Sequence, residues 1–184
     1  MQSNLASLQA ARGHHADSAP QHREILARRS RVLGALHPTT ATSMTLLANE
    51  LIADSVALPE ARALPDSALA IQRHATGGRD DVASTLRVRG DLARKVGQAD
   101  TALSDYREAL ALTTVSVGLK HERVATLLAR IAAVHFSLQH RDSAVVQQGK
   151  AVRISRNALG AQHKRVAEMM ATLGRYENRN AGAR

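Results

Sequence analysis

The chain has 184 residues, of which 44% are hydrophobic, and its formal net charge is +9. It contains no cysteine, which excludes a disulfide framework and a thiolate metal site, and no apolar run is long enough to cross a membrane. Only three residues are aromatic and only four are proline. A core of Leu, Val, Ile and Ala in closely packed helices is therefore expected.

The helices are expected to come in pairs along the chain. Residues 2–12 should form the end of a helix and residues 16–33 its partner, with Gly34 as the C-cap. The expected units are then a partial unit at 1–36, complete units at 37–78, 79–120 and 121–162, and a half unit at 163–184. Pro65 falls inside the expected second helix of unit 37–78, where it should delay the start of that helix or bend it.

A period of 42 residues relates these units to one another. Small residues recur at this spacing at Ala6, Ala48, Gly90, Ala132 and Gly174. The loops between units are marked by Gly34, Gly77, Gly118 and Gly160, which precede His37, Arg79, His121 and His163. Agreement over four periods is typical of a stack of helical hairpins, in which each unit buries its core against its neighbours. The sequence thus predicts an all-α solenoid of nine helices, forming one domain over residues 1–184.

The repeats share the pattern H-x-x-V-A-x-x-L-x-x-[LI]-A, then a turn, then A-x6-A-[LV]-x-[LI]-x5-G. Residues 79–120 and 121–162 align with it without a gap, whereas the second half of unit 37–78 needs one extra residue in the turn. This pattern resembles the 42-residue tetratricopeptide repeat of kinesin light chains, which is abundant in bacterial multi-repeat proteins. The resemblance implies a right-handed superhelix whose concave face, lined by the first helix of each unit, receives a peptide or protein.

The groove positions carried over from this family give the candidate binding residues. They are Thr45, Asn49, Ser84, Arg87, Asp91, Arg94, Lys95 and Arg175. Repeats of this family often carry an Asn pair that hydrogen-bonds an extended peptide, and here Arg87 and Val88, or Ala129 and Arg130, stand in its place. The partner is therefore not expected to bind along the groove through an Asn ladder.

Four of these candidates share one face of a single predicted helix. Arg87, Asp91, Arg94 and Lys95 are spaced at i, i+4, i+7 and i+8. One interpretation is a solvated helix face with ion pairs between Asp91 and its basic neighbours. The other is a basic spot for an acidic segment or a C-terminal carboxylate, which the planar fork of arginine binds well.

No residue set in the sequence predicts catalysis, a metal site or a cofactor. His37, His121 and His163 occupy the same loop position of successive units, so they should lie apart and serve the start of each first helix. His140, Arg141 and Asp142 spell a protein-kinase triplet, but the following Leu, the downstream Asn and the Gly-rich loop are absent. We therefore expect a non-enzyme without cofactors or metal ions.

The expected function is a non-catalytic scaffold for protein–protein interaction, as part of a larger bacterial signalling or regulatory protein. The alternative is an Arg-rich helical module that binds nucleic acid, because the chain is basic and residues 141–184 carry nine basic against three acidic residues. The incomplete terminal units predict self-association or a longer array of repeats. The first residues do not read as a secretory signal, and a cytoplasmic location is expected.

Overall fold

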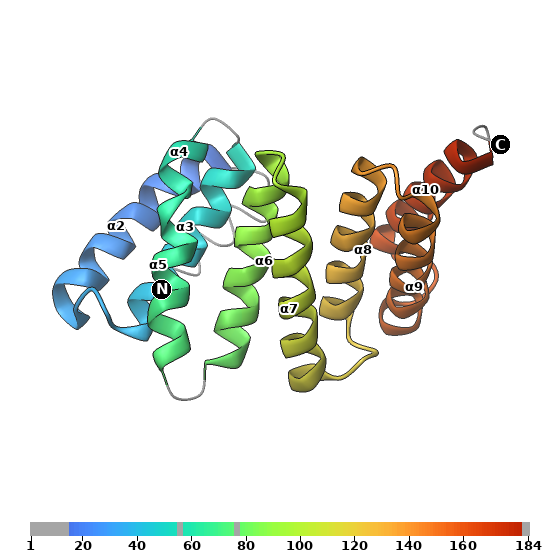
Figure 1. Cartoon of the computed structure of the whole chain (residues 1–184). Helices are drawn as coiled ribbons and strands as arrows, with labels where there is room; N and C mark the ends of the chain where they lie inside the picture. Colours follow the sequence, from blue (N-terminus) through green and yellow to red (C-terminus); the bar gives the residue numbers. More distant parts are fainter. Residues whose placement is uncertain (1–14, 55–56, 76–77, 182–184) are drawn as a thin grey trace. The chain divides into compact units, whose positions relative to one another are not determined.

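The computed structural model describes residues 15–54, 57–75 and 78–181, which form eight long helices and one four-residue helix, without a strand among them (Figure 1). The elements are α2 (His15–Leu33), α3 (Pro38–Asp54), α4 (Leu58–Ala61), α5 (Ala63–His74), α6 (Arg79–Lys95), α7 (Ala99–Val117), α8 (Glu122–Ser137), α9 (Arg141–Leu159) and α10 (Lys164–Ala181). The predicted all-α fold is confirmed. The helix expected at 2–12 lies outside the described residues.

The first helices of the predicted repeats are α3, α6, α8 and α10, and the second helices are α2, α5, α7 and α9. The chain divides into two compact units, residues 1–96 and 97–184, and each is described by itself below. The division falls in the turn between α6 and α7. A single domain over the whole chain stays a prediction.

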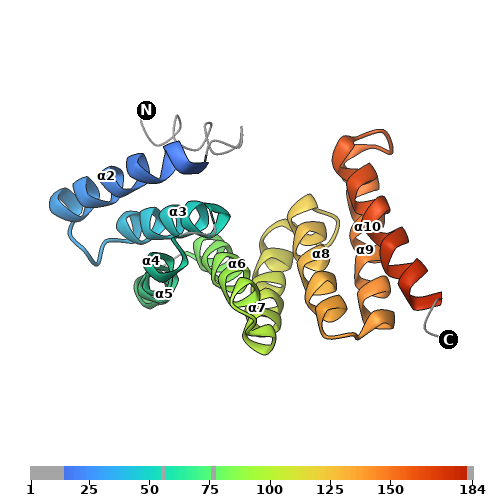
Figure 2. The same ribbon diagram turned by 90° about the horizontal axis from the view of Figure 1, so that it is seen from above.

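In the first unit, α3 packs against α2, α5 and α6, and Figure 2 shows α2 and α3 side by side. Its core contains Leu47, Ala48, Leu51, Val88 and Leu92. Ala48, a member of the 42-residue series, is fully buried. Its short side chain leaves room for the neighbouring helices to approach closely, where a larger one would push them apart.

The second helix of repeat 37–78 is interrupted near its start. A four-residue helix, α4, ends at Ala61, and α5 starts at Ala63. Pro65 therefore lies in the first turn of α5, where its missing N–H is not needed for an intrahelical hydrogen bond. The predicted delay is not observed, because the helical segment already begins at Leu58; instead it breaks at Arg62, and what was expected as one helix is two.

In the second unit, α8 packs against α7 and α9, and α9 packs against α10. One core cluster joins Val124, Ala125 and Leu128 of α8 to Ala151 of α9. Ala132 and Ala144 belong to a second cluster and are both fully buried. The small side chains at 132 and 144 thus stand where α8 and α9 meet, as the repeat pattern predicts.

The loops before α3, α8 and α10 share one geometry. Each follows a glycine with positive φ, namely Gly34 (93°), Gly118 (81°) and Gly160 (88°), a conformation that glycine adopts without a steric penalty at the end of a helix. The glycine expected to mark the corresponding loop before α6, Gly77, lies outside the described residues.

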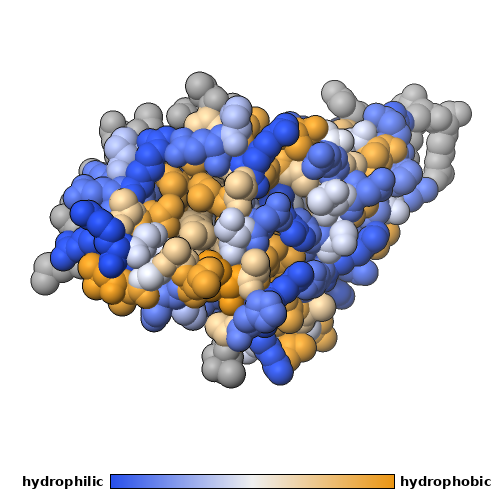
Figure 3. Space-filling view, turned by 60° about the vertical axis from the view of Figure 1, so that its left-hand side comes forward, coloured by the Kyte–Doolittle hydropathy of each residue, from blue (hydrophilic) through white to orange (hydrophobic). Residues whose placement is uncertain are grey.

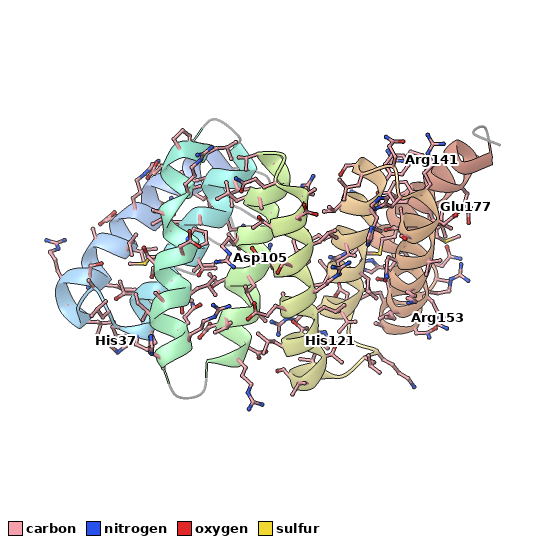
Figure 4. The ribbon with its side chains drawn as sticks, viewed as in Figure 1. His37, Asp105, His121, Arg141, Arg153 and Glu177 are labelled. Carbon is pink, nitrogen blue, oxygen red and sulfur yellow. The ribbon has the colours of Figure 1, made fainter. Side chains whose placement is uncertain are left out.

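A histidine caps each of these three first helices. The Nδ1 atom of His37 accepts a hydrogen bond from the backbone N–H of Thr39 (3.1 Å), and His121 and His163 accept equally from Arg123 (3.1 Å) and Arg165 (3.2 Å). Figure 4 shows His37 and His121 at the starts of their helices. The structural role predicted for these histidines is confirmed, because each satisfies a backbone donor that the helix leaves free.

Several large apolar side chains of the described residues are exposed, among them Leu36 (81%), Leu119 (69%) and Met170 (44%). Figure 3 shows apolar and hydrophilic side chains next to one another on one face of the molecule. Apolar surface is thus available for contacts with a partner. Among the described helices, none is both long and apolar enough to span a membrane.

Candidate functional site

The predicted binding residues of the first unit lie where α3 and α6 meet. Thr45 is only 5% exposed. Its hydroxyl oxygen lies 2.7 Å from that of Thr85, which in turn donates a hydrogen bond to Oε1 of Gln72 (2.8 Å). Thr45 therefore joins α3 to its neighbours and offers little surface to a partner.

Arg87 links the same two helices one turn further along. Its Nη2 donates to Oδ1 of Asn49 on α3 (3.2 Å), and its Nη1 donates to Oδ2 of Asp91 (2.9 Å). The side chains of Arg87 and Asp91 are 26% and 14% exposed. The ion pair expected between Arg87 and Asp91 is thus present, and it is half-buried.

Lys95 also binds to α3, because its Nζ donates a hydrogen bond to the backbone carbonyl of Ile52. Ser84 is half-buried. Arg94 is exposed, and it makes no ion pair or side-chain hydrogen bond within the described ranges. Of the four charged candidates on α6, Arg94 therefore has the guanidinium most available to a partner, whereas Arg87 and Lys95 hold α6 to α3.

In the second unit, the first helices α8 and α10 form an aromatic pocket of about 430 Å³. It is lined by Phe136, Thr172, Arg175, Tyr176 and Asn178. The rings of Phe136 and Tyr176 are stacked, with centroids 4.3 Å apart and planes inclined by 19°. Arg175 is exposed and donates from Nη2 to the hydroxyl of Thr172 (2.9 Å). Arg175 thus joins a pocket with an apolar, aromatic wall.

An arginine also fastens α10 to α8 at the other end of these helices. Arg165 donates from Nη1 to Oε1 of Glu122, and from Nη2 to the hydroxyl of Thr126 (2.6 Å). Arg165 stands at a different repeat position from Arg87, whose counterpart on α10 is Ala171, but it makes the same kind of contact between first helices. In each unit an arginine on one first helix thus holds the preceding first helix, which keeps their shared face in place.

Tyr176 was not among the residues predicted from the sequence. The signal was present, because two of only three aromatic residues, Phe136 and Tyr176, are separated by nearly one repeat. The repeat alone does not show whether two such rings touch. Arg175 occupies the repeat position of Asn49 and Asp91, and Phe136 that of Arg94. These repeat positions thus hold polar or charged residues in the first unit, whereas in the second unit they hold an arginine and an aromatic ring that line one pocket.

Two histidines, the buried His22 and the half-buried His135, have pKa values shifted from the ordinary value. Burial lowers the pKa of His22; the nearby carboxylate of Glu50 opposes this shift and Arg29 adds to it. Burial also lowers the pKa of His135, with smaller contributions in the same direction from Arg107 and His140. Within the described ranges, no three His, Asp or Glu side chains gather as a metal site would require.

Comparison with known proteins places this arrangement in a family. Two family models, both described as tetratricopeptide repeat, match residues 81–157 and 1–39, and together they span more than half of the chain. A search of curated proteins found no match.

Solved structures share the fold at low sequence identity. A putative kinesin light chain with nearly identical TPR-like repeats from Podosopora anserina has a TM-score of 0.77 and 18% identity, covering 98% of this chain and 86% of that one. BtubC (BKLC) from P. vanneervenii has a TM-score of 0.73 and 19% identity, covering 91% of this chain and 66% of that one. MamA has a TM-score of 0.54 and 13% identity, covering 97% of both chains.

Tetratricopeptide repeats form protein–protein interaction scaffolds that are typically non-catalytic, and the helical hairpins described above have the geometry of such repeats. The chain belongs to the tetratricopeptide repeat family, and its fold is similar to that of the repeats of a putative kinesin light chain.

Proposed function

We propose that the chain binds a segment of a partner protein on the surface formed by the first helices α8 and α10 of its second unit. The aromatic pocket takes an apolar side chain of that segment, and Arg175 binds an acidic group beside it. The observation that carries this proposal is the pocket itself, because all five of its lining residues come from the first helices α8 and α10.

The aromatic pocket has the features of an anchoring point for a protein segment. Its volume of about 430 Å³ lies within the range of about 300–1,000 Å³ that is usual for ligand pockets. Stacked rings provide a rigid apolar wall at little cost in side-chain entropy, which is why aromatic residues often dominate binding energy. Thr172 and Asn178 supply polar groups at the same pocket, and these can fix the orientation of the bound segment.

The guanidinium of Arg175 supports the proposal that the partner segment carries an acidic group. A guanidinium has five N–H donors, and one nitrogen of Arg175 contacts Thr172. The remaining donors can meet a carboxylate in the bidentate geometry that arginine favours. In the first unit Arg94 offers a second exposed guanidinium for the same kind of contact, with the half-buried Ser84 nearly three turns away on the same helix.

The roles of the other predicted residues follow from their contacts. Asn49, Asp91 and Arg87 form one half-buried network between α3 and α6. Replacing Arg87 by glutamate would place a carboxylate beside Asp91 and disturb the helix packing. Loss of binding in such a variant could not be separated from loss of structure, so Arg94 and Arg175 are the better positions to change.

The test compares capture of partner proteins by the full chain and by two charge-reversed variants. The first carries Arg94→Glu and Arg175→Glu. The matched control carries Arg28→Glu and Arg62→Glu, which are exposed positions outside the first helices and change the net charge equally. Quantitative mass spectrometry should show a protein whose capture falls at least tenfold with the first variant and stays unchanged with the control.

Circular dichroism checks that both variants keep the helicity of the parent chain. Equal capture of every partner by both variants would place binding elsewhere and overturn the proposal. Neither a bacterial source nor a cytoplasmic location is needed for this test, and both stay predictions from the sequence.

A further inference from the structure

A groove of about 540 Å³ lies in the second unit between α7 and α9. Figure 1 places these two helices on either side of α8. Val124 and Leu128 of α8 line the groove and are only 2% and 8% exposed, so α8 forms its floor. The groove is thus built mainly on second helices and shares no residue with the aromatic pocket.

The inner surface of the groove is apolar. Leu110 of α7 and Ile154 of α9 line it and pack on the core cluster that contains Val124 and Leu128. Leu119, in the loop between α7 and α8, forms one wall of the groove, and this residue is 69% exposed. The accessible apolar surface of the groove is therefore that of Leu119 and of the half-buried Leu110 and Ile154, and its burial would favour an apolar side chain of the ligand.

The rim of the groove is basic. Lys120 comes from the loop before α8, and Lys150 and Arg153 lie one turn apart on α9. All three side chains are exposed. No acidic residue lines the groove. None of the three cations has an ion-pair partner within the ranges that the structure describes.

The cations are specific to this place in the chain. One repeat earlier, the positions of Lys150 and Arg153 hold Glu108 and Ala111, and that of Lys120 holds Gly78. The helical hairpin therefore forms without basic residues at these positions. Three unpaired cations around one apolar floor indicate a ligand that is apolar and negatively charged at the same time.

We propose that this basic groove binds an acidic amphipathic segment of a partner protein. Leucine or isoleucine side chains of the segment lie on the floor, and its carboxylates meet Lys120, Lys150 and Arg153. A protein segment fits better than a nucleic acid, because no aromatic side chain lines the groove to stack on a base. The open, exposed rim also suits a chain that continues beyond the groove in both directions.

This second surface is independent of the one on the first helices. The two lie on different helices of the second unit, except that both use α8, at opposite ends of that helix. Either surface can be disabled while the other stays intact, so the two proposals can fail separately.

The test uses a displayed library of random 12-residue peptides selected on the full chain. Selected peptides are then measured by fluorescence anisotropy against three proteins. These are the parent chain, the groove variant Lys150→Glu with Arg153→Glu, and the first-helix variant Arg94→Glu with Arg175→Glu. Both variants change the net charge by the same amount at exposed residues.

We expect a class of peptides, rich in Asp or Glu together with Leu or Ile, whose Kd rises at least tenfold with the groove variant. Their Kd should change less than twofold with the first-helix variant. Leu119→Ser, at an exposed position, should weaken the same peptides about threefold without loss of helicity. The affinity should also fall as salt is raised, because the contacts at the rim are exposed.

Two results would overturn the proposal. One is that no selected peptide distinguishes the groove variant from the parent chain, or that those which do are basic. The other is that a 15-nucleotide RNA or DNA, or vesicles with 30% anionic lipid, bind the parent chain and lose binding in the groove variant while acidic peptides do not. That outcome would assign the groove to a different class of ligand.

Discussion

The ring of Phe136 on α8 stacks on the ring of Tyr176 on α10, with the centroids 4.3 Å apart. The contact joins the first helices of two successive repeats and forms the apolar wall of the aromatic pocket. The same pair of side chains thus contributes both to the packing of the second unit and to the surface proposed for partner binding.

The stack gives a prediction for stability. Phe136→Leu keeps an apolar side chain but removes the ring contact, and aromatic pairs contribute about 0.5–1.5 kcal/mol beyond the burial of their area. We expect the free energy of unfolding to fall by about 1 kcal/mol in urea denaturation. Phe136→Tyr keeps the ring and is the control. If the leucine variant were as stable as the parent chain, the stacking of the two rings would contribute nothing to the free energy of unfolding.

The histidine caps predict a loss of stability on replacement by alanine. His121→Ala removes the acceptor for the N–H of Arg123, and loss of an N-cap typically costs about 1 kcal/mol. His121→Asn, which supplies a side-chain acceptor of similar reach, should recover most of the loss. Urea denaturation of the three proteins measures both effects, and an asparagine variant no better than alanine would argue against a capping role.

The repeat predicts a stabilising substitution at Gln139. This residue has a φ of 62°, and its repeat counterpart, Gly97, has a φ of 80°. A left-handed conformation costs a side chain other than glycine about 1 kcal/mol or more, partly offset by the larger entropy that glycine loses on folding. Gln139→Gly should raise the thermal midpoint, whereas Gln139→Ala should not, and a lower midpoint for the glycine variant would contradict the expectation.

Much of this structure could be predicted from the sequence, because the features that recur in every repeat appear in the sequence at a spacing of 42 residues. It predicted the helix pairs, a structural role for His37, His121 and His163 at the helix starts, and the small residues at 132 and 144. These features depend on local backbone geometry or on contacts that every repeat makes, so they follow from the pattern itself.

Contacts that are particular to one repeat could not be predicted in this way. Thr45 was expected on the binding face but is buried against Thr85, because its orientation depends on the neighbouring helix. The basic groove combines Lys120 with Lys150 and Arg153, which are 30 or more residues away in the sequence. Only the packing of α7, α8 and α9 shows that they surround one apolar floor.

The buried His22 predicts that stability depends on pH. Its side chain is 1% exposed, and neither ring nitrogen has a hydrogen-bond partner among the described residues. Burial lowers its pKa in the folded state below the ordinary value of 6.5, despite the nearby carboxylate of Glu50. Below about pH 6.5, His22 therefore takes up a proton more readily in the unfolded chain than in the folded chain. The free energy of unfolding thus decreases as the pH falls.

Replacing His22 by leucine should remove this contribution. We expect His22→Leu to be at least as stable as the parent chain at pH 7.5, because an unpartnered polar group is replaced by an apolar one. Its loss of stability between pH 7.5 and pH 5 should be smaller, with a remainder from His135, whose pKa is shifted in the same direction. Equal losses in both proteins, measured by urea denaturation, would show that His22 is not the group responsible.

The outer face of α10 predicts self-association. Ala167 and Met170 are exposed on α10, whereas their repeat counterparts on α8, Ala125 and Leu128, are buried beside α9. A face of this composition favours contact with another apolar surface, here that of a second copy. Sedimentation equilibrium should show a concentration-dependent dimer that Met170→Glu weakens. A chain that is monomeric at all concentrations would contradict this.

The proposed binding of a partner segment in the aromatic pocket is tested most directly by one affinity ratio. For a partner captured by the parent chain, isothermal titration calorimetry gives the Kd for that chain, for Arg175→Glu and for the control Arg28→Glu. The account predicts a Kd at least tenfold higher for Arg175→Glu and an unchanged Kd for the control. The same Kd for all three proteins would contradict it.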